Sequence, residues 1–214
     1  MADSTAGFVL IVFAKAPVPG EVKTRLIPAL DAEHAAMLHA ALTERALATA
    51  LDSDADLIEL CCAPDDSHSF FQSCAEDFEI ELTLQGGGDL GERMLRVLER
   101  ALSEFAGAII IGADCPALTA KHIDAAAAAL AKHDIALTPA EDGGYALIGA
   151  RRTHPDMFKD ISWGSGSVLE QQRHNLKACG LRWHEMETLW DVDRPADLPR
   201  LQALRPPLEF FWPA

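Results

Sequence analysis

The sequence predicts an α/β domain built on a mostly parallel, mixed sheet, and the length of 214 residues suits one such domain over residues 1–214. Phe8–Phe13 is a run of six apolar residues, which is typical of a parallel strand covered on both faces. Strand-like and helix-like segments alternate after it, as in βαβ units. Residues 135–138 and 145–148 follow one another too closely for a helical crossover, so we expect one of these strands to run in the opposite direction.

The first half of the chain gives clear element signals. Asp31 is placed to cap a helix over residues 32–51. Strands are expected over residues 56–62 and 79–84, with a short helix near residues 69–75 between them. The second of these strands alternates apolar and polar residues, which indicates a position near the sheet edge.

Helix-start signals also organise the second half. Asp89 and Glu92 have capping-box spacing and predict a helix to about residue 105. A buried strand is expected at residues 108–111, followed by a helix that Thr119 caps. A second capping-box pattern, Ser167 with Glu170, predicts a helix to about residue 178.

The end of the chain gives three further signals. Gly180 stands where a C-cap glycine belongs after the preceding helix. A last helix is expected over residues 195–204. The aromatic tail Phe210–Trp212 is expected to dock on the body or on a partner subunit, so a homodimer stays open.

Composition excludes several classes of function. The formal net charge of −15 argues against nucleic acid and anionic membranes as partners, because both need broad basic surfaces. The longest apolar run near the start is far too short to span a bilayer, and residues 1–7 lack the basic start of a signal peptide. The five cysteines are odd in number and contain no Cys-x-x-Cys pair, which argues against a disulfide framework or structural zinc. We therefore expect a cytoplasmic location.

Three cations stand out in the loop after the first strand. Lys15, Lys23 and Arg25 surround a segment with two prolines and a glycine. Open α/β folds bind ligands at the carboxyl ends of their strands. Cations gathered there, in so acidic a chain, predict an anionic ligand such as a nucleotide phosphate, although each one taken singly also fits an ordinary surface charge.

The stretch from Phe13 to Leu26, FAKAPVPGEVKTRL, resembles the opening of a bacterial group of glycosyltransferases with the GT-A (nucleotide-diphospho-sugar transferase) fold, some of them linked to arsenosugar biosynthesis. A more distant resemblance is to the phospholactate and molybdenum-cofactor guanylyltransferases. The resemblance implies a three-layer α/β/α sandwich. It also implies that Lys15, Lys23 and Arg25 position donor phosphates, with Lys23 taking a catalytic part by stabilising developing charge.

A metal site is predicted from two separate stretches. Asp114 follows a buried strand, where a carboxylate can hold Mg²⁺ or Mn²⁺, and the family carries its metal-binding aspartate here. Pro116 replaces the second aspartate of the Asp-x-Asp pattern that glycosyltransferases of this fold often show. Asp191 and Asp193 resemble the late family element that closes the metal site. Alternatively, these aspartates cap a turn or stand at a helix start, where the helix dipole favours acidic residues.

Asp142, Gly143, Gly144 and Tyr145 form the loop between the two close strands, and alone this is also a strong turn signal. By resemblance it lines the acceptor side of the cleft. Asp142 is then a candidate general base for the acceptor hydroxyl, or a ligand of the donor sugar.

Two further loops join the expected site by resemblance. Gln85 and Gly86 open a glycine-rich loop that contacts the nucleobase or ribose, and Arg93 follows on the next helix. Trp163 lies in a Ser/Gly loop and either stacks on a sugar or fills the core. Without the resemblance, the first loop fits a solvent loop equally well.

The function expected is a metal-dependent transferase that uses a nucleotide-activated donor and a small-molecule acceptor. Glycosyl transfer from a nucleotide sugar follows the closer family resemblance. Nucleotidyl transfer from a nucleoside triphosphate to a phosphorylated acceptor is the alternative, favoured by Pro116. A catalytically silent nucleotide-binding protein is a third reading. Base, sugar and acceptor are not encoded in any recognisable pattern.

Overall fold

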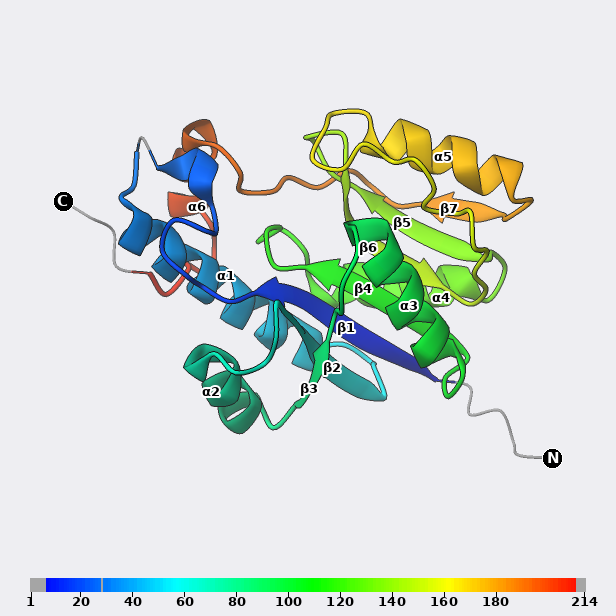
Figure 1. Ribbon diagram of the computed structural model, residues 1–214, viewed down its shortest axis with the longest axis horizontal. Coiled ribbons are helices and arrows are strands. Elements are labelled where there is room, and N and C mark those ends of the chain that lie inside the picture. The colour runs from blue at the N-terminus through cyan, green and yellow to red at the C-terminus, as the bar shows by residue number, and fades with distance from the viewer. Residues whose placement is uncertain (1–6, 28, 211–214) are drawn as a thin grey trace.

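A computed structural model describes residues 7–27 and 29–210 and contains one seven-stranded sheet (Figure 1). The strand order is β3-β2-β1-β4-β6-β5-β7. Their bounds are Phe8–Lys15 (β1), Leu57–Ala63 (β2), Glu81–Leu84 (β3), Gly107–Gly112 (β4), Ile135–Pro139 (β5), Tyr145–Ala150 (β6) and Trp183–Glu185 (β7). β6 runs antiparallel to both of its neighbours, whereas the other pairings are parallel. The mostly parallel, mixed sheet expected from the sequence is confirmed.

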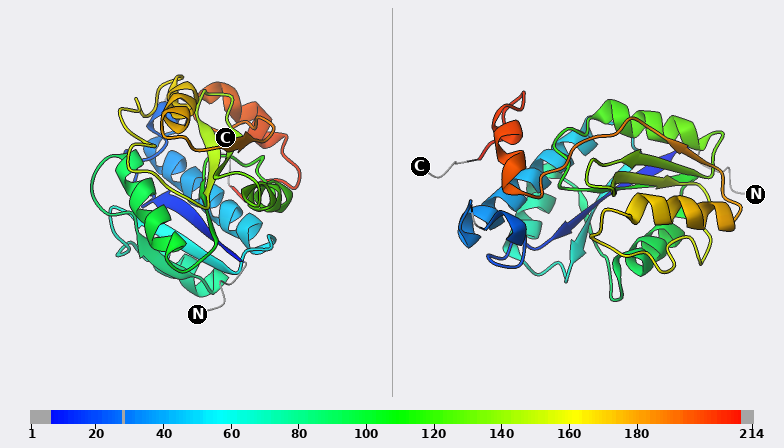
Figure 2. Two further views of the ribbon diagram at one scale, coloured as in Figure 1. Left: turned by 90° about the vertical axis from the view of Figure 1, so that its right-hand side faces the viewer. Right: turned by 90° about the horizontal axis from the view of Figure 1, so that it is seen from above.

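Helices cover both faces of this sheet (Figures 1 and 2). One face packs against α1 (Ala32–Leu51), α2 (Ser69–Phe78) and α4 (Ala120–Leu130). The other face packs against α3 (Leu90–Leu102) and α5 (Val168–Ala178). Each layer buries its own apolar cluster, which gives the three-layer α/β/α sandwich.

The strand order fixes where a ligand can bind. β1 lies between β2 and β4, because the chain first builds outward to β3 and then returns to the other side of β1. This reversal creates a switch point at the carboxyl ends of β1 and β4, where the two following loops diverge and leave a crevice. The first loop, with its cations, follows β1, and Asp114 follows β4.

Local capping signals account for most helix starts. The Asp31 side chain accepts a hydrogen bond from the backbone nitrogen of His34 at 2.8 Å. Asp89 and Glu92 form the expected reciprocal capping box at the start of α3. These three bonds satisfy backbone donors at the helix starts that have no partner within the helix.

Two sequence expectations differ from the structure, and one strand was not expected. Ser167 does not cap α5 with its side chain, because its hydroxyl lies 2.9 Å from that of Ser165. The last helix is broken into a short 3₁₀ turn, Pro195–Asp197, and α6, Leu198–Gln202. The three-residue strand β7 was not expected from the sequence at all.

A third apolar cluster joins the C-terminal segment to the outer face of α1. Leu38 and Leu42 of α1 pack with Val192 and with Leu201 of α6, and the half-buried Phe210 lies against the same cluster. Figure 2 shows α6 beside α1. Phe211 and Trp212, the rest of the aromatic tail, lie outside the described residues.

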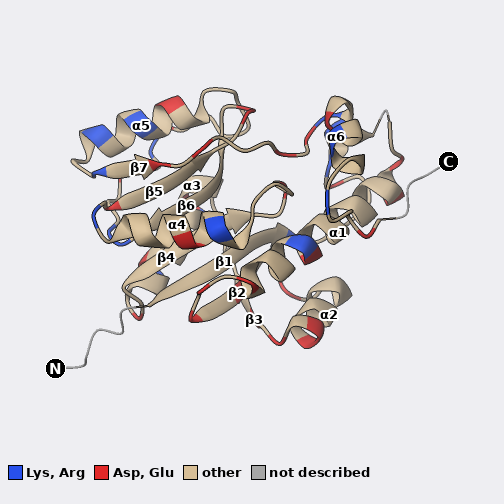
Figure 3. Ribbon diagram, turned by 180° about the vertical axis from the view of Figure 1, so that it is seen from behind, with Lys and Arg blue, Asp and Glu red and all other residues tan. Residues whose placement is uncertain are grey.

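The acidic character is spread over the molecule. Figure 3 shows Asp and Glu positions on helices of both layers, including α2, α4 and α5. Within residues 7–27 and 29–210, no helix combines the length and apolar character needed to cross a membrane.

Candidate functional site

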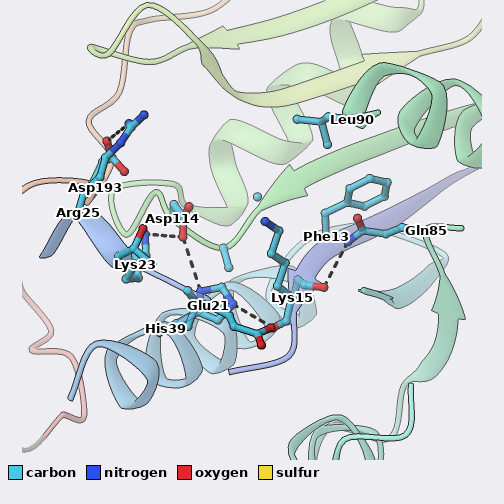
Figure 4. A pocket seen from close by; sticks show the side chains of 15 residues that line it. Phe13, Lys15, Glu21, Lys23, Arg25, His39, Gln85, Leu90, Asp114 and Asp193 are labelled. Carbon is cyan, nitrogen blue, oxygen red and sulfur yellow. Dashed lines mark hydrogen bonds and ion pairs between the residues drawn. The ribbon is translucent and has the colours of Figure 1, made fainter. Parts of the chain in front are cut away.

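Two adjoining cavities open at the switch point between β1 and β4. The first, which we call the lysine chamber, has a volume of about 350 Å³. Its charged and polar lining side chains are Lys15, Glu21, Lys23, Thr24, Arg25, His39, Gln85, Asp114 and Asp193 (Figure 4). Three cations and three carboxylates thus face this space.

The second cavity, the acidic chamber, has a volume of about 340 Å³. Its charged lining residues are Arg25, Asp114, Asp142, Asp191 and Asp193, and its apolar wall includes Phe13, Leu90, Met94, Ile110, Tyr145, Leu147, Ile148, Trp163 and Val168. The two chambers share Arg25, Asp114 and Asp193, which stand at their boundary.

Lys23 is held at the centre of the site. Its ammonium lies 2.5 Å from a carboxylate oxygen of Asp114 and donates to the backbone carbonyl of Val192 at 2.5 Å. Its backbone adopts the left-handed conformation (φ 49°, ψ 33°), which is uncommon outside glycine and indicates a constrained position. Only 4% of the side chain is exposed. Lys23 therefore joins the first loop, the loop after β4 and the late aspartate segment.

Arg25 makes a second link to the same late segment. Its guanidinium lies 2.6 Å from the Asp193 carboxylate and 3.5 Å from the carbonyl oxygen of Gly164. Hydrogen bonding and charge attraction from Asp193 raise the pKa of Arg25. Arg25 thus bridges the first loop and the loop that carries Trp163.

Lys15 is available for a ligand. Its side chain is exposed in the lysine chamber and forms no ion pair with any residue in the part of the chain that the structure describes. Of the three expected phosphate-binding cations, Lys23 and Arg25 already have carboxylate partners, and Lys15 does not.

His39 is a site residue that the sequence did not single out. It lies on α1, buried beneath the lysine chamber, with Nε2 3.0 Å from the Lys15 carbonyl oxygen and Nδ1 3.9 Å from Asp114. Burial lowers the pKa of His39, and the positive charge of Lys23 adds to this effect. No local pattern distinguishes it from the other helical histidines, because its neighbours come from β1 and β4.

The pKa values of Asp114 and Asp191 are shifted in opposite directions. The position of Asp114 within the cleft opposes its ionisation, but the charge and hydrogen bond of Lys23, together with the charges of His39 and Lys15, outweigh this effect and lower the pKa of the carboxyl. Burial raises the pKa of Asp191 to about 6, and the charges of Asp142 and Asp114 contribute in the same direction. Asp114, Asp142 and Asp191 thus share one region of negative charge with a single buried ammonium beside it.

The carboxylates expected to bind metal do not form a ready-made cage. Within the described residues, no three His, Cys, Asp or Glu side chains are arranged as a complete ligand set. Asp193 is occupied by Arg25. Asp114 and Asp191 both line the acidic chamber, and a backbone hydrogen bond of 2.8 Å from Val192 to the Asp114 carbonyl holds their two segments together.

Gln85 has a structural part that the sequence did not indicate. Its amide nitrogen donates to the carbonyls of Ala14 (3.2 Å) and Cys61 (2.9 Å), and the residue is buried. Its oxygen is the atom left to face the lysine chamber (Figure 4). Gly86 and Arg93 instead line a neighbouring hollow that shares Lys15 with the lysine chamber.

The loop from Asp142 to Tyr145 lies along the acidic chamber. The Asp142 carboxylate accepts a hydrogen bond from the backbone of Gly144 at 2.7 Å. Gly143 (φ +88°) approaches the backbone of Gly166, and a Cβ at this position would lie 2.2 Å from the Gly166 carbonyl oxygen. Gly143 is therefore needed for loop packing and does not itself line the chamber.

Two aromatic residues complete the apolar wall. The Tyr145 hydroxyl lies 3.3 Å from the side-chain oxygen of the fully buried Gln172, to which it donates. Trp163 packs at an angle on Phe158, with ring centroids 6.3 Å apart. Both residues line the acidic chamber.

Residues 28–165, more than half of the chain, match the family described as "Uncharacterized protein conserved in bacteria (DUF2064)". The chain belongs to this family. The matched range of this DUF2064 protein contains Asp114 and Asp142, and excludes Lys15, Lys23 and the late aspartates.

Two relatives fall in transferase classes. A phosphoenolpyruvate guanylyltransferase from Sphaerobacter thermophilus is 33% identical over 127 residues, which span 58% of this chain and 60% of that protein. A crystal structure from Desulfovibrio desulfuricans G20, described as a candidate nucleotide-diphospho-sugar transferase, matches with a TM-score of 0.83 and 28% identity over 94% of this chain and 90% of that one. The expected nucleotide-diphospho-sugar transferase-like fold is confirmed.

A more distant structure shares the fold alone. Glucosyl-3-phosphoglycerate synthase from Mycobacterium tuberculosis matches with a TM-score of 0.54 and 10% identity, over 94% of this chain and 77% of that one. That enzyme was solved with Mn²⁺ and uridine diphosphate. Both nucleotidyl and glycosyl transferases are therefore found among proteins with this architecture.

Proposed function

We propose that this DUF2064 protein is a glycosyltransferase that moves a sugar from a nucleotide-sugar donor to the hydroxyl group of a small-molecule acceptor. The observation that carries the proposal is the unequal charge of the two chambers. Three cations and three carboxylates face the lysine chamber, and one of these cations, Lys15, has no ion-pair partner among the described residues. The acidic chamber has four carboxylates and a single lining cation, Arg25, which is paired with Asp193. A diphosphate suits the first space, and a sugar with a neutral acceptor suits the second.

The chain's own residues have distinct parts in this reaction. Lys15, Lys23 and Arg25 hold the donor diphosphate and stabilise its charge as it leaves. Asp142 stands on the acceptor side and takes the proton of the acceptor hydroxyl. The acceptor oxygen then forms a bond to the anomeric carbon, the bond from that carbon to phosphate breaks, and its electron pair departs with the nucleoside diphosphate.

The donor set fits a divalent cation. Asp114 and Asp191 supply carboxylate oxygens. The pKa of Asp191 is raised first by burial and then by the charges of Asp142 and Asp114, and a cation would offset those two charges. Mg²⁺ is commonly held by one or two carboxylates together with substrate phosphates and water, so a complete protein cage is not required. When bound, the ion would neutralise the donor diphosphate.

Nucleotidyl transfer is the second candidate function, and the 33% identical guanylyltransferase favours it. That reaction would join a nucleotide to a phosphorylated acceptor and release pyrophosphate. The phosphorylated acceptor would have to lie in the acidic chamber, where the lining cation already has a partner. This charge distribution is why we rank glycosyl transfer first.

The released product separates the candidates. The purified protein is incubated with nucleotide sugars, or with nucleoside triphosphates and phosphoenolpyruvate, each with Mg²⁺ or Mn²⁺. Release of nucleoside diphosphate supports the proposal, and release of pyrophosphate supports the second candidate. Turnover in neither assay, with nucleotide binding retained in calorimetry, supports a non-catalytic nucleotide-binding protein.

A further inference from the structure

The geometry of the acidic chamber points to an acceptor that is an alcohol with an apolar body and no anionic group. This inference rests on the glycosyl transfer proposed above and names the substrate class of the same site. It is carried by two independent features of the chamber, its uncompensated carboxylates and its apolar wall.

The charges of the chamber disfavour an anionic acceptor. Asp142 and Asp191 form no ion pair with any residue in ranges 7–27 and 29–210, whereas Asp114 and Asp193 are paired with Lys23 and Arg25. A phosphate or carboxylate on the acceptor would face two unpaired carboxylates and find no free cation. A divalent ion does not change this result, because the two negative charges of the donor diphosphate offset it.

The opposite wall of the chamber is apolar. Leu90, the first residue of α3, is 40% exposed and lines both chambers. Phe13, Met94 and Trp163 continue this surface. The Tyr145 hydroxyl is committed to Gln172, so its ring is the part left for a ligand. Apolar walls with a few placed polar groups are typical of sites for small organic ligands.

Three acceptors with one carbon skeleton test the inference. Benzyl alcohol, its para-carboxy derivative and its para-aminomethyl derivative are compared as acceptors, with the nucleotide sugar that gives the highest rate of nucleoside diphosphate release. We expect kcat/KM for the carboxylated alcohol to be about tenfold lower than for benzyl alcohol, because its charge approaches the unpaired carboxylates. The aminomethyl derivative is expected to react at least as well as benzyl alcohol.

A charge introduced into the wall should reverse this preference. Leu90→Lys and Leu90→Arg place a cation at an exposed wall position, and we expect the tenfold difference to disappear. Leu84→Lys is the matched control, because Leu84 is an exposed leucine (52%) that does not line either chamber. Melting curves of all variants verify that they are folded.

The outcomes distinguish this inference from the function on which it rests. Loss of discrimination in the Leu90 variants, with discrimination kept in Leu84→Lys, supports the acceptor class. If the wild-type protein releases nucleoside diphosphate but prefers the carboxylated alcohol, the acceptor class is wrong and glycosyl transfer stands. If no nucleotide sugar yields nucleoside diphosphate and pyrophosphate appears from nucleoside triphosphates, both are overturned.

Discussion

The Lys23 ammonium lies 2.5 Å from the Asp114 carboxylate and occupies the space between Asp114 and the late segment around Val192. The cation is nearly buried, whereas 55% of the Asp114 side chain remains exposed in the cleft. Asp114 therefore keeps a face that a ligand can reach while Lys23 compensates its charge from beneath. Lys23 therefore contacts both of the other segments that build the site, the loop after β4 and the late aspartate segment.

Replacing Lys23 with methionine should destabilise the protein by about 1–2 kcal/mol, the scale of a hydrogen bond to a charged group with allowance for the solvent access of Asp114. Both side chains pay the same cost for the left-handed backbone, so the substitution isolates the ammonium. Urea unfolding measures the effect. Lys121→Met, at an exposed position on α4, is the control. Equal stability of the two variants would contradict the structural role of Lys23.

Asp191 should make the stability of the free protein depend on pH. Burial, with the nearby carboxylates, raises its pKa from 3.8 to about 6, so its protonated form is favoured in the folded state. The contribution of such a carboxyl to the free energy of unfolding is present below pH 3.8 and is lost as the pH rises through about 6. Asp191→Asn should therefore stabilise the free protein by about 1–2 kcal/mol near neutral pH, and by little near pH 4.

The same variant tests the metal. If Asp191 is a ligand, Mn²⁺ with a nucleoside diphosphate should raise the melting temperature of the wild-type protein clearly more than that of Asp191→Asn, since a ligand stabilises in proportion to its affinity. Asp124→Asn, on α4 away from both chambers, is the control substitution. An equal increase in all three proteins would remove Asp191 from the metal site.

Local signals explain which parts of the fold the sequence predicts well. The helix over residues 32–51 was predicted with its observed bounds, because Asp31 supplies a cap and the apolar spacing persists for the whole length. The strand β7 could not be predicted, because three residues carry almost no period and their pairing partner is the distant β5. Ser167 has a capping pattern, but its hydroxyl pairs with Ser165.

The candidate site divides in the same way. The positions of Lys15, Asp114 and Asp142 follow from strand ends, so the sequence could predict that they lie near one cleft. The pairing of Arg25 with Asp193 could not be predicted, because it joins two loops far apart in the chain. Gln85 shows the same limit. A glutamine beside glycines suggests a ligand contact. Its two hydrogen bonds to the carbonyls of Ala14 and Cys61 could not be predicted, because they depend on the register of β1 and β2.

Lys15→Ala should weaken binding of a nucleoside diphosphate by about 1.5–3 kcal/mol, the scale of a charge-assisted hydrogen bond. The fold should be unaffected, because Lys15 is exposed and forms no ion pair within the described residues. Arg25→Ala should also weaken binding while costing little stability, because the Arg25 side chain is 54% exposed. Calorimetric titration with uridine and guanosine diphosphates measures both effects. Affinities equal to that of Lys121→Ala would remove these cations from the phosphate site.

Gly143→Ala should loosen the acceptor side of the site more than the nucleotide side. The added Cβ would lie 2.2 Å from the Gly166 carbonyl oxygen, on a backbone with φ of +88°, so the two loops must separate. Their separation also strains the hydrogen bond of 2.8 Å from the Leu169 nitrogen to the Gly143 carbonyl, which lies at the start of α5.

Gly164→Ala provides the matched control for this substitution. Gly164 has a similar φ of +75°, but a Cβ there would meet nothing within 4 Å, so the variant pays the backbone cost alone. We expect a loss of about 1 kcal/mol for Gly164→Ala and about 3 kcal/mol for Gly143→Ala in urea unfolding. In Gly143→Ala the KM for the acceptor should rise while the affinity for nucleoside diphosphate is unchanged, because the lysine chamber does not include this loop. Equal losses of stability in the two variants would mean that the close approach to Gly166 is easily relaxed and does not hold the acceptor loop in place.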